Sequence, residues 1–103
     1  MSIEEIIEKF SQEVEGENGA EEKILIFSIS TCVWCKRCKT FLNEKNLKYR
    51  FIDVDKIDPT DKAKIIDYVK EKYQSRITYP FLACESGYVG GYNPNKYMEL
   101  LKN

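Results

Sequence analysis

The sequence predicts an α/β fold in which a small mixed sheet is flanked by helices on both faces. Apolar segments of strand length alternate with amphipathic segments of helical spacing, and the last two strand segments are separated only by Glu85–Gly87. A crossover helix between two strands makes them parallel, whereas so short a turn makes them antiparallel. We therefore expect a four-stranded mixed sheet with an extra helix at the N-terminus.

The composition is that of one ordinary globular domain. The chain has 103 residues, 43% of them hydrophobic, and we expect a single domain with an N-terminal helix and linker at 1–22 and a core at 23–103. Sixteen basic and seventeen acidic residues give a net charge of −1, so no overall field would attract nucleic acid or an anionic membrane. Since neither a signal peptide nor a membrane span is evident, we expect a protein of the cytoplasm. We also expect it to be a monomer.

The expected N-terminal helix begins with a capping box, Ser2 followed by Glu5. Its apolar residues recur at helical spacing until Gly16, and they are Ile3, Ile6, Ile7, Phe10 and Val14. The polar segment 15–22, which contains two glycines, is then expected to be a linker.

Two strands and two helices are expected next. The near-continuous apolar run 23–28 is typical of a strand buried on both faces, and 36–45 favours a helix. Alternating polar and apolar residues at 48–54 predict a second strand. Asp58 is then an N-cap with proline directly after it, so we expect a second crossover helix over 59–73.

The C-terminal part predicts a hairpin and a last helix. Segments 81–84 and 88–89 are short apolar strands joined by a turn, so they should pair antiparallel. Asn93 and Pro94 repeat the cap-plus-proline start, and the apolar stripe of the helix that follows consists of Tyr97, Leu100 and Leu101.

The segment Cys32-Val33-Trp34-Cys35 stands between the first of these strands and its helix. Backbone N–H groups and the positive end of the dipole at a helix start favour the thiolate form of a cysteine. Two thiols three residues apart can form and break a reversible disulfide. Because the chain has no histidine, a Cys-His dyad and a zinc site with imidazole ligands are excluded.

Three motifs in this order resemble the glutaredoxin branch of the thioredoxin-like fold, from Lys23 to the C-terminus. They are Cys32-Val33-Trp34-Cys35, Thr78-Tyr79-Pro80 and Gly90-Gly91-Tyr92-Asn93. The resemblance implies that the protein is a thiol–disulfide oxidoreductase with a redox-active disulfide. It also implies a function in electron transport and cell redox homeostasis. Cys32 would be the attacking thiolate, and Cys35 would resolve the mixed disulfide.

The resemblance also implies where a disulfide-containing protein or small molecule would bind. The family has a cis proline that faces the active-site sulfurs, so Pro80 is expected to expose the backbone of Tyr79. Gly90 and Gly91 allow close approach to a ligand, and the Asn93 cap leaves helix N–H groups for a carboxylate. The expected substrate-binding residues are Trp34, Thr78, Tyr79, Pro80, Gly90, Gly91, Tyr92 and Asn93.

The chain departs from the family at the positions that hold the glycine carboxylate of glutathione. Many glutaredoxins have a lysine where this chain has Ile29, and a polar or basic side chain where it has Ile66. Val33-Trp34 replaces the commoner Pro-Tyr pair, and Tyr79 replaces a valine. Arg76 is either a compensating carboxylate partner or a surface charge. The electron donor could therefore be glutathione or a reductase, and we expect glutathione to be the poorer one.

Two further cysteines leave alternatives open. Cys38 is expected to be a core residue, or else an accessory resolving thiol, since it lies three residues after Cys35. Cys84 is expected in the core. We expect that the dithiol chemistry requires no metal and no other cofactor. The alternative from another class is a zinc or iron–sulfur carrier that uses the four cysteines, or a cluster shared between two chains through Cys32.

Overall fold

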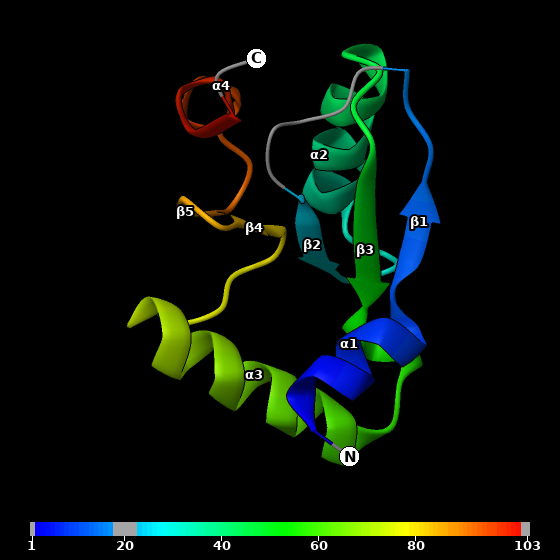
Figure 1. Ribbon diagram of the computed structural model, residues 1–103, viewed down its shortest axis with the longest axis vertical. Helices are drawn as coiled ribbons and strands as arrows, with labels where there is room; N and C mark the ends of the chain where they lie inside the picture. The colour runs from blue at the N-terminus through cyan, green and yellow to red at the C-terminus, as the bar shows by residue number, and fades with distance from the viewer. Residues whose placement is uncertain (1, 18–22, 102–103) are drawn as a thin grey trace.

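The computed structural model describes residues 2–17 and 23–101, which form one five-stranded sheet with helices on both faces (Figure 1). The elements in chain order are α1 (Ile3–Phe10), β1 (Gln12–Val14), β2 (Leu25–Ser28), α2 (Val33–Glu44), β3 (Tyr49–Asp53), the 3-10 helix η1 (Val54–Lys56), α3 (Pro59–Tyr73), β4 (Phe81–Cys84), β5 (Gly87–Gly90) and α4 (Pro94–Leu101). The strand order is β1-β3-β2-β4-β5. Among the strands of the described residues only β2 and β3 pair in parallel, so the predicted mixed α/β sheet is confirmed.

Three helices begin at the caps expected from the sequence. The backbone N–H of Glu5 donates to Ser2 Oγ at 3.2 Å at the start of α1. Asp58 Oδ1 accepts from the N–H of Thr60 at 2.7 Å, with Pro59 in the first position of α3. Before α4, Asn93 Oδ1 accepts from the N–H of Lys96 at 3.2 Å. These side chains satisfy backbone donors that have no partner inside the helix.

The N-terminal helix is shorter than predicted, and the sheet has one more strand. Helix α1 ends at Phe10, and the residues that continued its spacing, Gln12–Val14, form β1 antiparallel to β3. Val14 packs against the core from this edge strand instead of from a helix. The helix predicted from this spacing was wrong for Gln12–Val14, because the backbone of these residues makes its hydrogen bonds with β3. The expected linker lies outside the described residues from position 18 onward.

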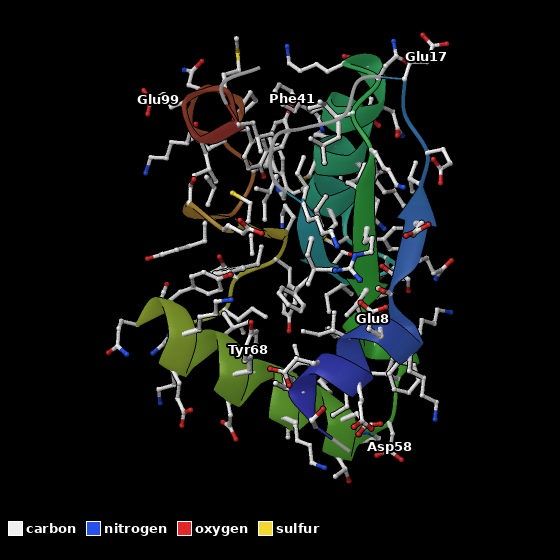
Figure 2. The ribbon with its side chains drawn as sticks, in the orientation of Figure 1. Glu8, Glu17, Phe41, Asp58, Tyr68 and Glu99 are labelled. Carbon is white, nitrogen blue, oxygen red and sulfur yellow. The ribbon has the colours of Figure 1, made fainter. Side chains whose placement is uncertain are left out.

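The two faces of the sheet carry separate apolar cores. Helices α1 and α3 cover one face and α2 and α4 the other, as Figure 1 shows. Strand β2 supplies both, since Ile26 enters the α2/α4 core and Phe27 the α1/α3 core, and neither is more than 1% exposed. Burying such a side chain contributes about 1.5–3 kcal/mol. Between α2 and α4, Phe41 (labelled in Figure 2) meets the ring of Tyr97 at a centroid distance of 5.5 Å.

None of the helices within the described ranges is both long and apolar enough to cross a membrane.

Gly16 marks the place where the chain after β1 passes closest to the segment before β3. A Cβ atom at this position would lie 2.4 Å from the carbonyl oxygen of Asn46 and 2.7 Å from the backbone nitrogen of Lys48. We expect Gly16→Ala to lower the free energy of unfolding by about 1–3 kcal/mol, because the added methyl group would force the backbone of one of the two segments to move. Urea denaturation measures this, with exposed Glu17→Ala as the control. Equal stability of the two variants would contradict the close approach.

Candidate functional site

Cys32 is the N-cap residue of α2. Its sulfur accepts a hydrogen bond from the backbone N–H of Cys35 at 3.2 Å, and its carbonyl accepts from the N–H of Lys36 at 3.2 Å. The helix therefore begins at Val33, three residues earlier than predicted, because a sulfur can replace the oxygen of the usual capping side chains. A negative charge on this sulfur lies at the positive end of the helix dipole.

The two thiols of the motif differ in exposure. Cys32 is partly exposed, whereas Cys35 is fully buried. Burial, together with the hydrogen bond and the charge of neighbouring Cys32, raises the pKa of the Cys35 thiol to about 12. At neutral pH Cys35 is therefore a protonated thiol, and Cys32 is the one that an incoming disulfide can reach.

Asp55 anchors the loop that leads to Cys32. Its carboxylate accepts two hydrogen bonds from Ser30, from the backbone N–H at 2.9 Å and from Oγ at 2.5 Å. These hydrogen bonds lower the pKa of Asp55. This contact was not predicted from the sequence. An aspartate just after β3 was a usable signal, because parallel β2 and β3 end at the same edge of the sheet.

A second polar contact fastens α2 to the same edge. Lys39 Nζ lies 3.3 Å from Asp53 Oδ1 and 3.9 Å from the centroid of the Phe51 ring. Asp53 Oδ1 also accepts from Ser28 Oγ at 2.5 Å, and Ser28 is fully buried. The C-terminal ends of β2 and β3 are thus tied to the helix that carries the thiols.

The other two motifs meet each other at the glycine pair. The Tyr79–Pro80 peptide bond is cis, as expected, and the Pro80 carbonyl accepts from the N–H of Gly91 at 2.7 Å. A Cβ atom on Gly90 would lie 2.8 Å from Thr78 Oγ1, so a side chain there would collide with the neighbouring segment. Gly91 has a φ of 82°, a conformation that glycine adopts without steric cost.

Aromatic contacts join the thiol motif to the glycine pair. Trp34 stacks on Tyr92 with ring centroids 5.7 Å apart, and the Arg37 guanidinium lies 5.1 Å from the Trp34 ring. Trp34 remains 55% exposed and Val33 61% exposed, so an apolar surface lies beside Cys32. The structure thus brings the first and third motifs together through these rings.

Tyr79 lies within the electrostatic reach of the dithiol. Burial raises the pKa of its phenol, and the charge of Cys35 raises it further. Within the part of the chain that the structure describes, its buried hydroxyl has no hydrogen-bond partner. Phe81, which follows this segment, pairs with Phe27 of β2, and Pro80 is hydrogen-bonded to Gly91, so segment 78–80 lies between the end of β2 that leads to Cys32 and the glycine pair. All three motifs therefore form one site.

The remaining cysteines are buried. Cys38 is 0% exposed in the α2/α4 core and Cys84, at the end of β4, is 6% exposed, so the expected core positions are confirmed. Burial raises the pKa of the Cys38 thiol to about 11. Among residues 2–17 and 23–101, no three Cys, Asp or Glu side chains lie where they could together hold a metal ion.

Ile29 and Ile66, the positions that depart from the family, have different surroundings. Ile29 packs against the α1/α3 core. Ile66 and Arg76 line an open groove of about 870 Å³ at the C-terminal end of α3, together with Lys70 and Ile77. Arg76 is exposed there, two residues before Thr78, which places a positive charge near the segment expected to bind substrate.

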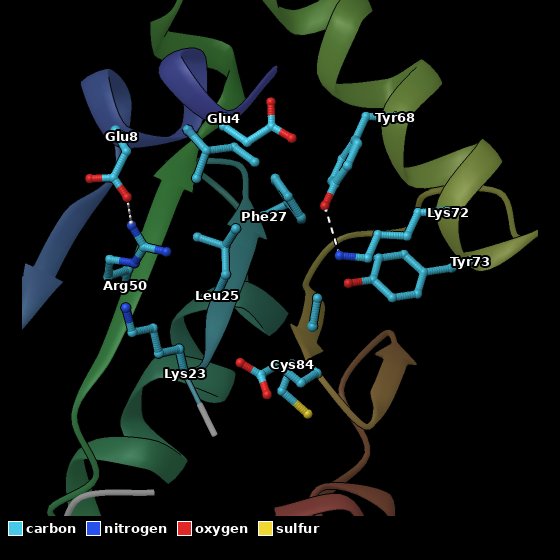
Figure 3. Close-up of a pocket in the computed structure, with 13 residues that line it drawn as sticks. Glu4, Glu8, Lys23, Leu25, Phe27, Arg50, Tyr68, Lys72, Tyr73 and Cys84 are labelled. Atoms are coloured by element: carbon cyan, nitrogen blue, oxygen red, sulfur yellow. Dashed lines mark hydrogen bonds and ion pairs between the residues drawn. The ribbon is translucent and has the colours of Figure 1, made fainter. Parts of the chain in front are cut away.

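A second cavity, of about 230 Å³, lies between α1, α3 and the start of β2 (Figure 3). Leu25, Arg50 and Cys84 are among its lining residues. Since β2 begins at Leu25 and leads to Cys32 only beyond its other end, this cavity is not part of the thiol site.

Comparison with known proteins agrees with this geometry. The model of the glutaredoxin family matches residues 24–86. Glutaredoxin-1 of Rhizophagus irregularis is 34% identical over 68 residues, which are 66% of this chain and 64% of that protein. The chain spans between 51% and 67% of the length of the curated relatives that it matches.

Solved structures give the same result. The glutaredoxin from Methanosarcina mazei Go1 has a TM-score of 0.77 at 21% identity and covers 91% of this chain and 89% of its own. Methanosarcina acetivorans methanoredoxin has a TM-score of 0.69 at 26% identity, over 79% of this chain and 85% of its own. The chain therefore belongs to the glutaredoxin family of the thioredoxin-like superfamily.

Proposed function

We propose that this protein is a dithiol oxidoreductase that reduces disulfides through Cys32 and Cys35. Membership of the glutaredoxin family supports a thiol redox function. The observation that carries the dithiol proposal is the arrangement of the two sulfurs: Cys32 is partly exposed at the N-cap of α2, and buried Cys35 donates its N–H to the Cys32 sulfur at 3.2 Å. No metal or nucleotide is needed for this chemistry.

In the first step the Cys32 thiolate attacks one sulfur of a substrate disulfide. The substrate S–S bond breaks, a mixed disulfide forms on Cys32, and the leaving thiolate takes a proton from solvent. The Cys35 N–H stabilises the negative charge on the Cys32 sulfur before the attack. The exposed side chains of Val33 and Trp34 and the backbone of Tyr79 and Gly90 offer contacts for the substrate.

In the second step Cys35 attacks the Cys32 sulfur and releases the reduced substrate. The Cys35 proton passes to the departing thiolate, and an intramolecular disulfide remains. Besides burial, the hydrogen bond and charge of Cys32 keep the pKa of Cys35 high. Formation of the mixed disulfide removes that charge, so Cys35 becomes easier to deprotonate only after the first step. A two-electron reductant then restores the dithiol.

Replacement of each thiol separates the two steps. We expect Cys32→Ser to abolish reduction of a protein disulfide, because the three remaining thiols are buried. We expect Cys35→Ser to accumulate a mixed disulfide on Cys32, because the resolving thiol is missing. Stopped-flow turnover and mass spectrometry of the trapped adduct measure these outcomes, with buried Cys84→Ser as the control. Full activity of Cys32→Ser would contradict the proposal.

The apolar side chains of Ile29 and Ile66 bear on which electron donor the protein uses. We expect glutathione to support slower turnover than a thioredoxin-reductase-type system, because both side chains are apolar where a glutathione carboxylate needs a partner. Ile29→Lys should lower the KM for glutathione several-fold, since it restores a cation. Steady-state kinetics with each donor measure this, with Lys23→Gln as a charge-changing control far from the site. A micromolar KM for glutathione in the unaltered protein would show the expectation to be wrong.

A further inference from the structure

Charged residues are distributed unevenly between the thiol site and the rest of the chain. The protein as a whole has a net charge of −1, yet the three segments that carry the motifs, 29–43, 74–84 and 86–98, contain no aspartate or glutamate. Their basic residues are Lys36, Arg37, Lys39, Arg76 and Lys96. All of these except Lys39 are exposed. The site therefore carries positive charge in a protein that is negative overall.

The carboxylates at the neighbouring end of β3 and in η1 are engaged within the protein. Asp53 Oδ1 lies 3.3 Å from Lys39 Nζ, so these two charges offset each other. Asp55 accepts two hydrogen bonds from Ser30. Among the residues that the structure describes, the four exposed basic side chains of the motif segments form no ion pair. Their charges are thus available to a binding partner.

Arg37 lies over the exposed apolar surface beside Cys32. Its guanidinium is 5.1 Å from the Trp34 ring, and that ring stacks on Tyr92 with centroids 5.7 Å apart. Contacts on both sides of Trp34 hold its ring in place while it remains more than half exposed, as does Val33. A cation and an apolar face are therefore presented together next to the attacking sulfur.

We propose that this surface selects polypeptide disulfides in which an apolar and an acidic side chain flank the reacting cysteine. The inference rests on the proposed function and deepens it, because it names a substrate class for the same thiol. The apolar side chain covers Val33 and Trp34, and the acidic one pairs with Arg37. Glutathione has carboxylates but no large apolar side chain, so it leaves Val33 and Trp34 uncovered, whereas a polypeptide supplies both groups.

Reduction of designed peptides by the reduced full chain tests this selection. The probes are peptides closed by one internal disulfide, in which the two residues next to one cysteine are Leu-Glu, Leu-Lys or Ser-Glu. Rates are measured by acid quench and mass spectrometry, and each is divided by the rate with dithiothreitol to correct for the reactivity of the peptide itself. We expect the Leu-Glu peptide to react about 2- to 5-fold faster than the Leu-Lys peptide. Its advantage over the Ser-Glu peptide should be about 5- to 10-fold, because leucine buries apolar surface.

Variants at the proposed surface should change the preference between peptides. Arg37→Glu should make the Leu-Lys peptide the faster one, and Trp34→Ala should remove the preference for Leu-Glu over Ser-Glu. Lys23→Glu changes the net charge as Arg37→Glu does, but it lies before the opposite end of β2, so it should retain the preference of the unaltered protein. An effect of Arg37 on the Cys32 thiolate alone would change all rates equally and leave their ratios as they are.

Different results overturn different claims. If the unaltered protein reduces neither the peptides nor glutathione disulfide, the proposed dithiol function fails, and the inference fails with it. If it reduces the Leu-Glu and Leu-Lys peptides equally, or if Arg37→Glu and Lys23→Glu shift their ratio equally, selection by Arg37 is wrong. Faster corrected reduction of glutathione disulfide than of the Leu-Glu peptide would show that polypeptides are not the preferred class.

Discussion

The hydrogen bond from the Cys35 N–H to the Cys32 sulfur is the contact on which the reactive end of the molecule depends. It ends the loop after β2, begins α2 and places one sulfur at the positive end of a helix. It also makes the two thiols unlike, because the same geometry leaves Cys32 partly exposed and buries Cys35. In the proposed cycle, the order of the two attacks follows from this difference.

The rest of the site is arranged around that cap by contacts between segments distant in sequence. Asp55 holds the loop before Cys32, and Trp34 stacks on Tyr92. Gly91 donates its N–H to the carbonyl of Pro80 in the cis-proline segment, and its own carbonyl accepts from the side-chain hydroxyl of Tyr97 in α4. These contacts link the thiol motif to the loop before it and to the glycine pair after the cis proline.

Local chemistry made much of this predictable from the sequence. The caps at Ser2 and Asp58, the alternation in β3 and the short hairpin turn are each determined by neighbouring residues, and each is present. Strand β1 was not predictable in this way. Val14 continues a helical spacing, and only the open edge of β3, a feature of the folded sheet, makes Gln12–Val14 a strand.

The site was predictable to the same extent and for the same reason. Three motifs placed the thiols, the cis proline and the glycine pair, but Asp55 acts through Ser30, which is remote in sequence, and Tyr97 acts through its hydroxyl. Tyr97 was expected as one residue of an apolar stripe, and only the folded structure shows that its hydroxyl donates to the carbonyl oxygen of Gly91.

The most direct measurement is the alkylation rate of each cysteine in the reduced protein as a function of pH, with the modified residues identified by peptide mass spectrometry. We expect Cys32 to be modified first at neutral pH, because it is the partly exposed thiol. Cys35 and Cys38, whose pKa values burial raises to about 12 and about 11, should stay protected until the solution is strongly alkaline or the protein unfolds. Modification of Cys35 or Cys38 ahead of Cys32 at neutral pH would contradict the assignment of Cys32 as the attacking thiol.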